Sequence, residues 1–415
     1  MTTGHTKAFR SSMTFAPEEV SDVLSRKIAE ENEIAQASSS SADMELEEEL
    51  LAQLEGKYDP QKVNILSLFS GAGGLDLGVK LAGAAVINGR ETAYSAFDDR
   101  TKFENLASGI NFVYSNDLFE AANISYIQNV APDVVKDSRD IRKVVHFPKS
   151  DLILGGFPCP GFSSAGPRLL DDPRNFLYIH YIRAITQSQP KFFIAENVKG
   201  LMTMARGQVL EQIIEDFTAC GYQVQAKLTN ARDYGVPQLR ERVFIIGVRN
   251  DIVESQNYTY EYPKPTHGAN TGVPYVTLRD TIKDLEEDPN QEVFETSYSS
   301  IYMSRNRKKS WDEQSFTIQA SGRQAPQHPG GEPMKKLGKD EWVFQGDKNR
   351  RLSVRESARI QTFPDWFEFS DGHKKERNNQ LNEKYKQIGN AVPVFLAEKI
   401  SEPIISYLIQ SLPQH

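Results

Sequence analysis

The chain has 415 residues, of which 39% are hydrophobic and 10% aromatic, a composition typical of a soluble globular protein with two or three domains. No apolar stretch reaches the roughly 18 residues of a membrane-spanning helix, and the N-terminus lacks the apolar core of a signal peptide, so we expect no membrane association. Two cysteines exclude a disulfide framework and predict a cytoplasmic protein, and the seven histidines lack the spacing of a metal site.

The net charge of -8 is carried entirely by residues 1–60, which contain five Lys or Arg against 13 Asp or Glu. Residues 1–42 are polar and end in a Ser-rich stretch, and residues 43–55 (DMELEEELLAQLE) predict an acidic helix. We expect residues 1–60 to form a flexible acidic arm. Residues 298–361 contain 13 Lys or Arg against seven Asp or Glu, and this basic stretch either binds a polyanion or is a solvated charged surface.

From Val63 onward, short apolar runs alternate with helical stretches, which is typical of a βα sheet. Residues 64–69 (NILSLF) predict a buried strand, and residues 70–78 (SGAGGLDLG) predict a Gly-rich turn that opens a helix ending near Ala82. Glycines at such a turn let the backbone approach a ligand at the helix N-terminus, although a tight structural turn has the same pattern.

Acidic residues follow the next two predicted strands. Residues 84–111 look like an insertion, after which NFVYSND (111–117) predicts a strand ending in Asp117. A carboxylate at that place can hold ribose hydroxyls, and Glu91 is the competing candidate. Residues 136–141 (KDSRDI) place Asp140 at the end of a third strand.

Cys159 lies in a Gly- and Pro-rich turn, GGFPCPGFSSAG (155–166), directly after a buried strand predicted at 151–156. Open α/β sheets bind ligands at the carboxyl ends of their strands, so the thiol is a candidate nucleophile, with an inert buried cysteine as the alternative. After a helix at about 174–187, a strand at 191–201 brings Glu196, which suits an acid catalyst or a structural cap.

Residues 230–248 contain Gln238, Arg240 and Arg242 beside an apolar strand. Alternate residues of an extended segment point to one side, so we expect the two arginines to aim at the same place. The periodicity loosens past Asn250, which indicates a domain boundary near residue 260.

Taken together and in order, these stretches resemble the DNA cytosine-5 methyltransferase family over residues 63–408. The resemblance is carried by six motifs: FSGAGGLDLG (69–78), PCPGFS (158–163), ENV (196–198), QLRER (238–242), RLSVRESARIQTFP (351–364) and GNAVP (389–393). This chain departs from the family pattern at Pro160, where Gln is usual, and at Leu118, where an aromatic residue is common.

The resemblance implies an α/β fold with a doubly wound, mostly parallel sheet, in which residues 61–260 form a catalytic domain completed by residues 385–415. Residues 261–384 would form a smaller, irregular target-recognition domain. The implied reaction is methyl transfer from S-adenosylmethionine to carbon 5 of a cytosine flipped out of double-stranded DNA. Its implied catalytic residues are Cys159, which adds covalently to the base, with Ser163, Glu196, Arg240 and Arg242.

The same resemblance implies a set of cofactor-binding residues, with Asp117 on the ribose and Asp140 near the adenine. They are Phe69, Ser70, Gly71, Ala72, Gly73, Gly74, Leu75, Asp117, Leu118, Asp140, Ile141, Pro158, Leu177, Asn390, Ala391 and Val392.

Residues 297–311 and 316–324 resemble the recognition region of bacterial enzymes that methylate GGCC. This implies methylation of the inner cytosine of GGCC, with Gln238, Arg305, Arg307 and Arg323 on the DNA bases and Lys308 and Lys309 on phosphates. It also implies a monomer without a metal, associated with the nucleoid and accompanied by a restriction endonuclease acting on the same site. The alternatives are a nicotinamide-dependent oxidoreductase, a non-catalytic DNA-binding protein and an RNA cytosine-5 methyltransferase.

Overall fold

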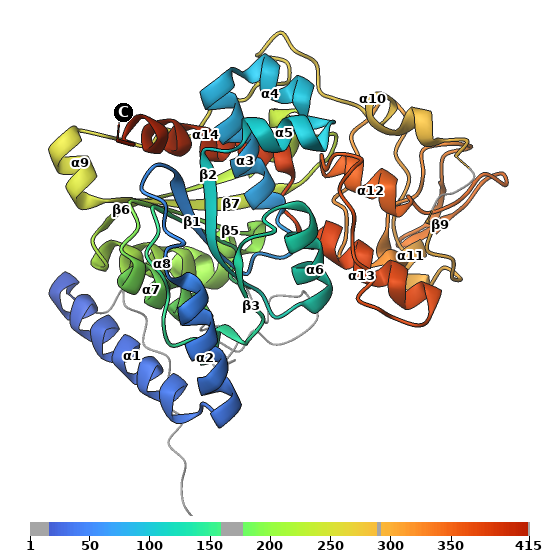
Figure 1. The fold of residues 1–415 in the computed structure, drawn as a ribbon. Helices are drawn as coiled ribbons and strands as arrows, with labels where there is room; N and C mark the ends of the chain where they lie inside the picture. The colour runs from blue at the N-terminus through green and yellow to red at the C-terminus, as the bar shows by residue number, and fades with distance from the viewer. Residues whose placement is uncertain (1–15, 159–176, 289–291, 414–415) are drawn as a thin grey trace, which may run out of the picture.

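A seven-stranded sheet forms the centre of the computed structural model, which describes residues 16–158, 177–288 and 292–413 (Figure 1). The strand order is β3-β2-β1-β4-β5-β7-β6, and β7 is antiparallel to both of its neighbours while the other pairs are parallel. The strands are β1 (Val63–Leu68), β2 (Ile110–Asn116), β3 (Val135–Asp137), β4 (Leu152–Gly155), β5 (Phe192–Val198), β6 (Tyr222–Asn230) and β7 (Glu241–Arg249). The order runs outward from β1 in both directions, so the predicted doubly wound, mostly parallel sheet is confirmed.

Two apolar cores cover the two faces of this sheet. Phe192 and Ile194 of β5 belong to the core with α3 (Gly74–Asn88) and α14 (Val394–Gln410). Phe193 and Ala195 belong to the core with α7 (Leu177–Ser188) and α8 (Gln208–Ala219). Successive side chains of a strand point to opposite faces, and because both faces are covered the central strands β1, β4 and β5 are mostly apolar.

Residues 84–111 extend the first core. Helix α3 continues to Asn88, beyond its predicted end near Ala82, and α4 (Arg90–Phe97) and α5 (Arg100–Leu106) follow before β2. The Tyr94 hydroxyl donates to Glu398 Oε2 of α14 at 3.0 Å, and Arg90 forms an ion pair with Glu402 of the same helix. The insertion is therefore fastened to α14. Two further short helices flank the sheet, α6 (Glu120–Asn129) after β2 and α9 (Asn250–Gln256) after β7.

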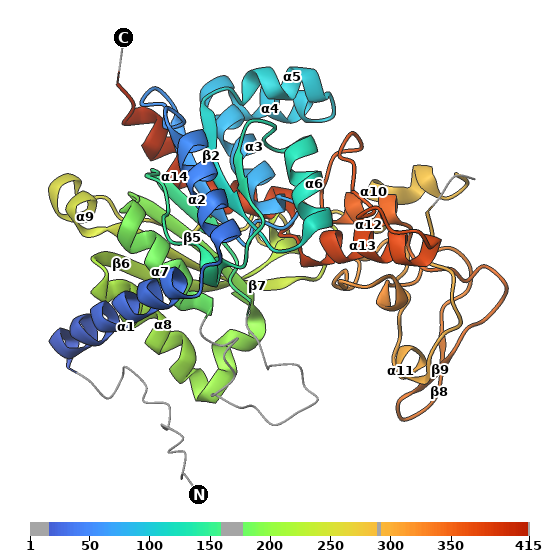
Figure 2. The same ribbon diagram turned by 60° about the horizontal axis from the view of Figure 1, so that its bottom comes forward.

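The N-terminal region differs from the flexible arm that the sequence predicts. Residues 17–54 form two helices, α1 (Pro17–Ala37) and α2 (Ser41–Leu54), which lie against the α7 and α8 face in Figures 1 and 2. Val20, Leu24 and Leu50 are buried in that core. The Ser-rich stretch supplies only the turn between the helices and the cap of α2, where Ser40 Oγ accepts a hydrogen bond from the Asp43 N–H at 3.1 Å. Residues 17–54 are thus an integral part of the fold.

A second lobe, orange in Figures 1 and 2, is built mainly from loops beside the sheet. Its regular elements are α10 (Leu278–Ile282), α11 (Ser300–Met303), β8 (Lys335–Gly338), β9 (Glu341–Val343), α12 (Val354–Ile360) and α13 (Arg377–Asn390). The chain just past residue 260 still belongs to the sheet lobe, because the Tyr262 hydroxyl donates to Phe244 O of β7 at 2.8 Å. Helix α13 brings the chain back to the sheet. Within the described ranges, no helix has the length and apolarity needed to span a membrane.

Candidate functional site

A cavity of about 550 Å³ opens at the carboxyl ends of β1, β2, β4 and β5. This is the edge at which open α/β sheets bind ligands, and the volume lies in the range of small-molecule sites. Every residue predicted to bind the cofactor lines this cavity except Gly73. A Cβ atom on Gly73, whose φ is +86°, would lie 2.6 Å from Val130 and 2.9 Å from Tyr126, so this glycine serves the turn itself.

Asp117 holds the glycine loop after β1 in place at the wall of the cavity. The Asp117 carboxylate accepts hydrogen bonds from the Gly71 N–H at 2.8 Å and from the Phe119 N–H at 2.7 Å. Burial raises the pKa of Asp117, and these two hydrogen bonds oppose that shift. Asp117 therefore ties the end of β2 to the glycine loop, whereas Glu91, the competing candidate, is exposed on α4 and does not line the cavity.

The loop between α13 and α14 closes the cavity over the glycine turn. A Cβ atom on Gly74 would lie 2.4 Å from Val392 O and 3.1 Å from the Cβ of Ala391, so the first turn of α3 can approach this loop only as glycine. Asn390 is exposed at the rim of the cavity. The two motifs at opposite ends of the chain thus form one pocket.

Arg240 and Arg242 both line the cavity, but their guanidinium groups have different partners. Arg240 is fully buried, and its Nη2 donates to Gly389 O and Ala391 O, each at 2.9 Å, while Nη1 donates to Ile318 O at 3.3 Å. Both Nη atoms of its guanidinium therefore donate to backbone carbonyls, whereas the buried Nε has no hydrogen-bond partner among the described residues. Arg240 consequently positions the α13–α14 loop and is not free to contact a base.

Arg242 instead faces Glu196. The antiparallel register pairs Val198 of β5 with Arg242 of β7, and Arg242 Nε lies 2.8 Å from Glu196 Oε1. Both side chains are largely buried, at 14% and 13% exposed, and both line the cavity. A Cβ atom on Gly156 would lie 3.1 Å from Glu196 Oε2, so a glycine there allows the carboxylate to lie close to the backbone.

Asn197 fixes the chain that leads to the predicted nucleophile. Its buried Nδ2 donates to Phe157 O at 3.0 Å, and Phe157 and Pro158 are the last residues described before Cys159. The predicted catalytic residues Cys159 and Ser163 lie outside the described residues. The described chain places Pro158 in the cavity wall together with Glu196 and Arg242.

Several cavity residues escaped the sequence analysis. Asp76 is fully buried one turn into α3, where burial raises its pKa to about 6 and the Tyr126 hydroxyl donates to Oδ1 at 2.9 Å. Lys386 stacks its ammonium over the Phe119 ring, 4.0 Å from the centroid, one helical turn before Asn390. The spacing of four residues from Asn390 was the available signal for Lys386, and a lone Asp in the apolar run GLDLG was the signal for Asp76.

Of the residues predicted to contact DNA, some are exposed and others are buried. Arg305 and Arg323 are exposed on the second lobe. Arg307 is buried, and its guanidinium donates to Tyr302 O at 2.9 Å and to Gln324 Oε1 at 3.0 Å. Gln238 is fully buried and therefore does not reach DNA in this structure, which corrects the prediction.

The buried polar residues hold the second lobe together. Gln238 Nε2 donates to Gln361 Oε1 at 2.9 Å, and its Oε1 accepts from the Ile318 N–H at 3.0 Å. Lys308 is also buried, with Nζ donating to Lys348 O and Asn349 Oδ1, and Lys309 pairs with Glu313 at 2.7 Å. The prediction of phosphate contacts is thus corrected for Lys308, whose ammonium is occupied. Across the described parts of the chain, no group of three His, Cys, Asp or Glu side chains could hold a metal ion.

Comparison with known proteins gives a consistent result. The C-5 cytosine-specific DNA methylase family matches residues 63–406. The chain is 56% identical over 411 residues to the type II methyltransferase M.BsuRI of Bacillus subtilis, covering 97% of this chain and 91% of that protein. It is 54% identical over 407 residues to the type II methyltransferase M.BspRI of Lysinibacillus sphaericus, covering 96% and 92%.

Solved structures share the fold at low identity. A protein assigned as a DNA modification methyltransferase in an E. coli prophage superposes with a TM-score of 0.58 at 22% identity, covering 84% of this chain and 99% of that one. DNMT2 of Spodoptera frugiperda gives a TM-score of 0.52 at 19% identity, covering 85% and 99%. With the match over residues 63–406 and the two near-full-length relatives, the chain belongs to the C-5 cytosine-specific DNA methylase family, which transfers methyl groups from S-adenosylmethionine to carbon 5 of cytosine in DNA.

Proposed function

We propose that this protein methylates the inner cytosine of GGCC in double-stranded DNA and protects that site in a bacterial restriction-modification system. The observation that carries the proposal is a single cavity, which is lined both by the glycine loop after β1 and by the paired side chains of Glu196 and Arg242. The choice of GGCC rests on the resemblance of residues 297–311 and 316–324 to enzymes of that specificity. Both relatives are type II methyltransferases. This favours a companion restriction endonuclease and a cytoplasmic location on the nucleoid.

The residues of the cavity fit S-adenosylmethionine, which when bound supplies a methyl group activated by a sulfonium. Ser70 Oγ is buried and has no hydrogen-bond partner within the described chain, so a polar ligand group can satisfy it. Asp117 offers carboxylate lone pairs to ribose hydroxyls, and Asp140 offers an acceptor for an adenine amino group. The N-terminus of α3 favours a carboxylate.

Cytosine carbon 5 is a poor nucleophile, so the base must be made electron-rich. We assign this to the Cys159 thiolate, which adds to carbon 6 and places electron density on carbon 5 and nitrogen 3. Glu196 in its protonated form would donate a hydrogen bond to nitrogen 3, and Arg242 would hold the base oxygen. After carbon 5 takes the methyl group, loss of its proton and expulsion of the thiolate restore the ring. The base must leave the duplex for these contacts to form.

The two lobes have different functions in this proposal. In this proposal residues 61–260 and 385–415 carry the cofactor and the chemistry, residues 261–384 read the DNA sequence, and the protein acts as a monomer. Helix α13 spans both parts, since it begins in the second lobe and ends at Asn390 in the cavity rim.

Methyl transfer to defined duplexes tests the proposal. The full-length chain is incubated with labelled S-adenosylmethionine and duplexes that carry GGCC or another GC-rich four-base palindrome, and bisulfite sequencing then locates the product. We expect label only in GGCC duplexes, at the inner cytosine of each strand. Methylation of a different palindrome would overturn the sequence choice, label in a transfer RNA substrate alone would favour the RNA alternative, and binding without label would favour the non-catalytic one.

Arg305→Ala and Arg323→Ala are each expected to weaken binding to a GGCC duplex by about 1 to 3 kcal/mol and to relax discrimination at one base position. The reason is that an exposed guanidinium can bind both major-groove acceptors of a guanine. Dissociation constants for GGCC and single-mismatch duplexes measure this at fixed salt. Arg26→Ala, on the exposed face of α1, is the matched control and should bind both duplexes like the original protein. Unchanged discrimination in Arg323→Ala would remove that residue from base recognition.

A further inference from the structure

The N-terminal helices contact the back of the cavity wall. Both α1 and α2 precede residues 63–406, the part that matches the family. Figures 1 and 2 show α1 along α7 and α8, and Figure 1 shows α2 beside β3. The segment 139–147 lies against α2, and its first four residues, Arg139 to Arg142, line the cavity. The helices thus touch the proposed cofactor site from outside.

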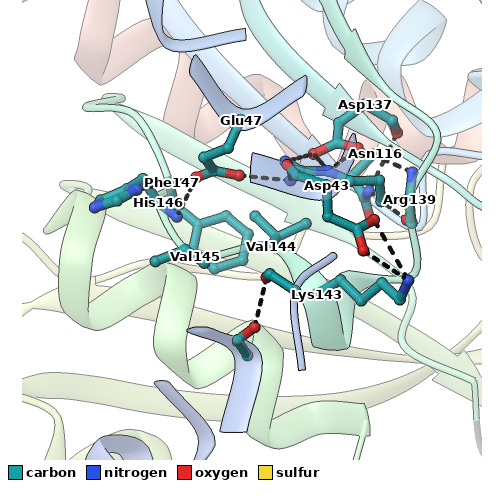
Figure 3. A network of polar contacts seen from close by, with 12 residues as sticks. Asp43, Glu47, Asn116, Asp137, Arg139, Lys143, Val144, Val145, His146 and Phe147 are labelled. Carbon is teal, nitrogen blue, oxygen red and sulfur yellow. Dashed lines mark hydrogen bonds and ion pairs between the residues drawn. The ribbon is translucent and has the colours of Figure 1, made fainter. Parts of the chain in front are cut away.

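Arg139 connects the cavity directly to α2 (Figure 3). Its Nη2 donates to Asp137 Oδ2 at 2.6 Å, and its Nη1 forms an ion pair with Glu47 Oε2 at 2.6 Å and donates to Asp43 O at 3.5 Å. The side chains of Arg139 and Glu47 are only 8% and 13% exposed. A nearly buried guanidinium is therefore held between one carboxylate from the sheet and one from α2.

Glu47 also binds the far end of the same segment. Its Oε1 accepts a hydrogen bond from the His146 N–H at 3.1 Å and lies 2.9 Å from His146 Nδ1. Lys143, between the two ends, pairs with Asp43 Oδ2 at 3.1 Å. One carboxylate of α2 consequently spans the segment from Arg139 to His146.

Helix α1 reaches the segment through α7. The buried Arg183 of α7 donates from Nη2 to Val144 O at 2.7 Å and from Nε to Asn32 Oδ1 of α1 at 2.8 Å. Between β3 and β4 the segment has regular structure only in the three-residue 3-10 turn Ile141–Lys143. Its position is therefore set by side chains of neighbouring elements, two of which are α1 and α2.

We propose that Glu47 is a positioning residue for cofactor binding, which holds Arg139 and with it the wall formed by Arg139 to Arg142. The inference rests on the proposed cofactor site. A residue that orients a binding group through one intermediate contact alters affinity for the ligand without touching it, and such supporting contacts decide how closely a site keeps its productive geometry.

The test is Glu47→Gln in the full-length chain. Glutamine keeps the size of the side chain and an acceptor for the His146 N–H, so α2 stays docked while the negative charge facing Arg139 is lost. We expect the KM for S-adenosylmethionine and the Kd for S-adenosylhomocysteine to rise on the order of fivefold. The kcat at saturating cofactor and the KM for DNA should change less than about twofold. Glu48→Gln, the neighbouring carboxylate exposed on α2, makes the same charge change away from Arg139 and should leave all four constants unchanged.

The results distinguish the role of Glu47 from the proposed location of the cofactor site. Normal cofactor affinity in Glu47→Gln, whether or not the melting temperature falls, would overturn the inference and show that Glu47 only stabilises the fold. A reduced kcat with unchanged cofactor affinity would overturn it as well. Asp117→Ala is measured in parallel, because normal cofactor affinity in that variant would overturn the proposed cofactor site and the inference with it.

Discussion

Cys159→Ser is expected to lower methyl transfer by more than about 10³-fold while leaving cofactor and DNA binding close to normal. A serine hydroxyl is not ionised near neutral pH, so it cannot add to carbon 6 as a thiolate does. Single-turnover transfer of labelled methyl groups to a GGCC duplex measures the loss. Turnover within about tenfold of the original protein would contradict covalent catalysis at this position.

The second cysteine provides the matched control. Cys220 is the C-cap of α8 and does not line the cavity, and burial raises the pKa of its thiol to about 12. It is therefore protonated at neutral pH, and Cys220→Ser should transfer methyl groups at a normal rate. A duplex with 5-fluorocytosine at the target separates the two cysteines directly, because fluorine at carbon 5 prevents release of the base. The adduct should form with Cys220→Ser and be absent with Cys159→Ser.

Glu196→Gln is expected to reduce kcat by about 10²- to 10³-fold with little change in the KM for the cofactor. The amide oxygen can still lie against the Arg242 guanidinium as the carboxylate does, so the contact between β5 and β7 is kept without its ionic part. Its NH2 group can donate a weaker, neutral hydrogen bond to nitrogen 3 but cannot transfer a proton to it, which removes stabilisation that appears only as charge develops there.

Glu241→Gln is the matched control, because it removes one carboxylate charge beside Arg242 without changing Glu196. Glu241 precedes Arg242 on β7 but pairs with Lys199 at 2.7 Å and is 39% exposed. Its loss should leave kcat unchanged. If Glu196→Gln turns over within about threefold of the original protein, Glu196 is a structural partner of Arg242 and not the group that binds the base.

The sheet and the cavity could be predicted because their signals are local. Buried strands such as β1 and β5 are largely apolar, and the residue at the end of each falls at one edge of a parallel sheet. Asp117 follows strand β2 and lines the cavity, whereas Glu91, which also follows an apolar run, lies on helix α4 and does not. The Glu196 and Arg242 contact could not be predicted in the same way, because it depends on β7 running antiparallel to β5.

The errors arose where a polar residue type was interpreted as exposed. Gln238 and Arg307 have partners far along the chain or in irregular loops, namely Gln361 and Gln324, and no periodic pattern indicates such contacts. At the N-terminus the helix predicted at residues 43–55 is present as α2, but α1 and the docking of both helices on the sheet lobe were missed for the opposite reason. Val20, Leu24 and Ile28 have the spacing of an apolar helical stripe, but the acidic composition and the serine run suggested disorder.

The guanidinium of Arg240 has a consequence for engineering sequence specificity. It binds Ile318 of the second lobe and the 389–391 loop at once, and a Cβ atom on Gly389 would lie 2.4 Å from Gln319 O. A recognition segment transplanted from a relative therefore cannot be joined at residues 315–320 without also disturbing the wall that closes over Gly74. Junctions should therefore lie outside this seam, with one donor stretch ending before Ser315 and a second beginning after Ala320 and ending before Gln361. Such a chimera exchanges the residues around Arg305 and Arg323 and retains the host's contacts between Arg240, Ile318 and the 389–391 loop.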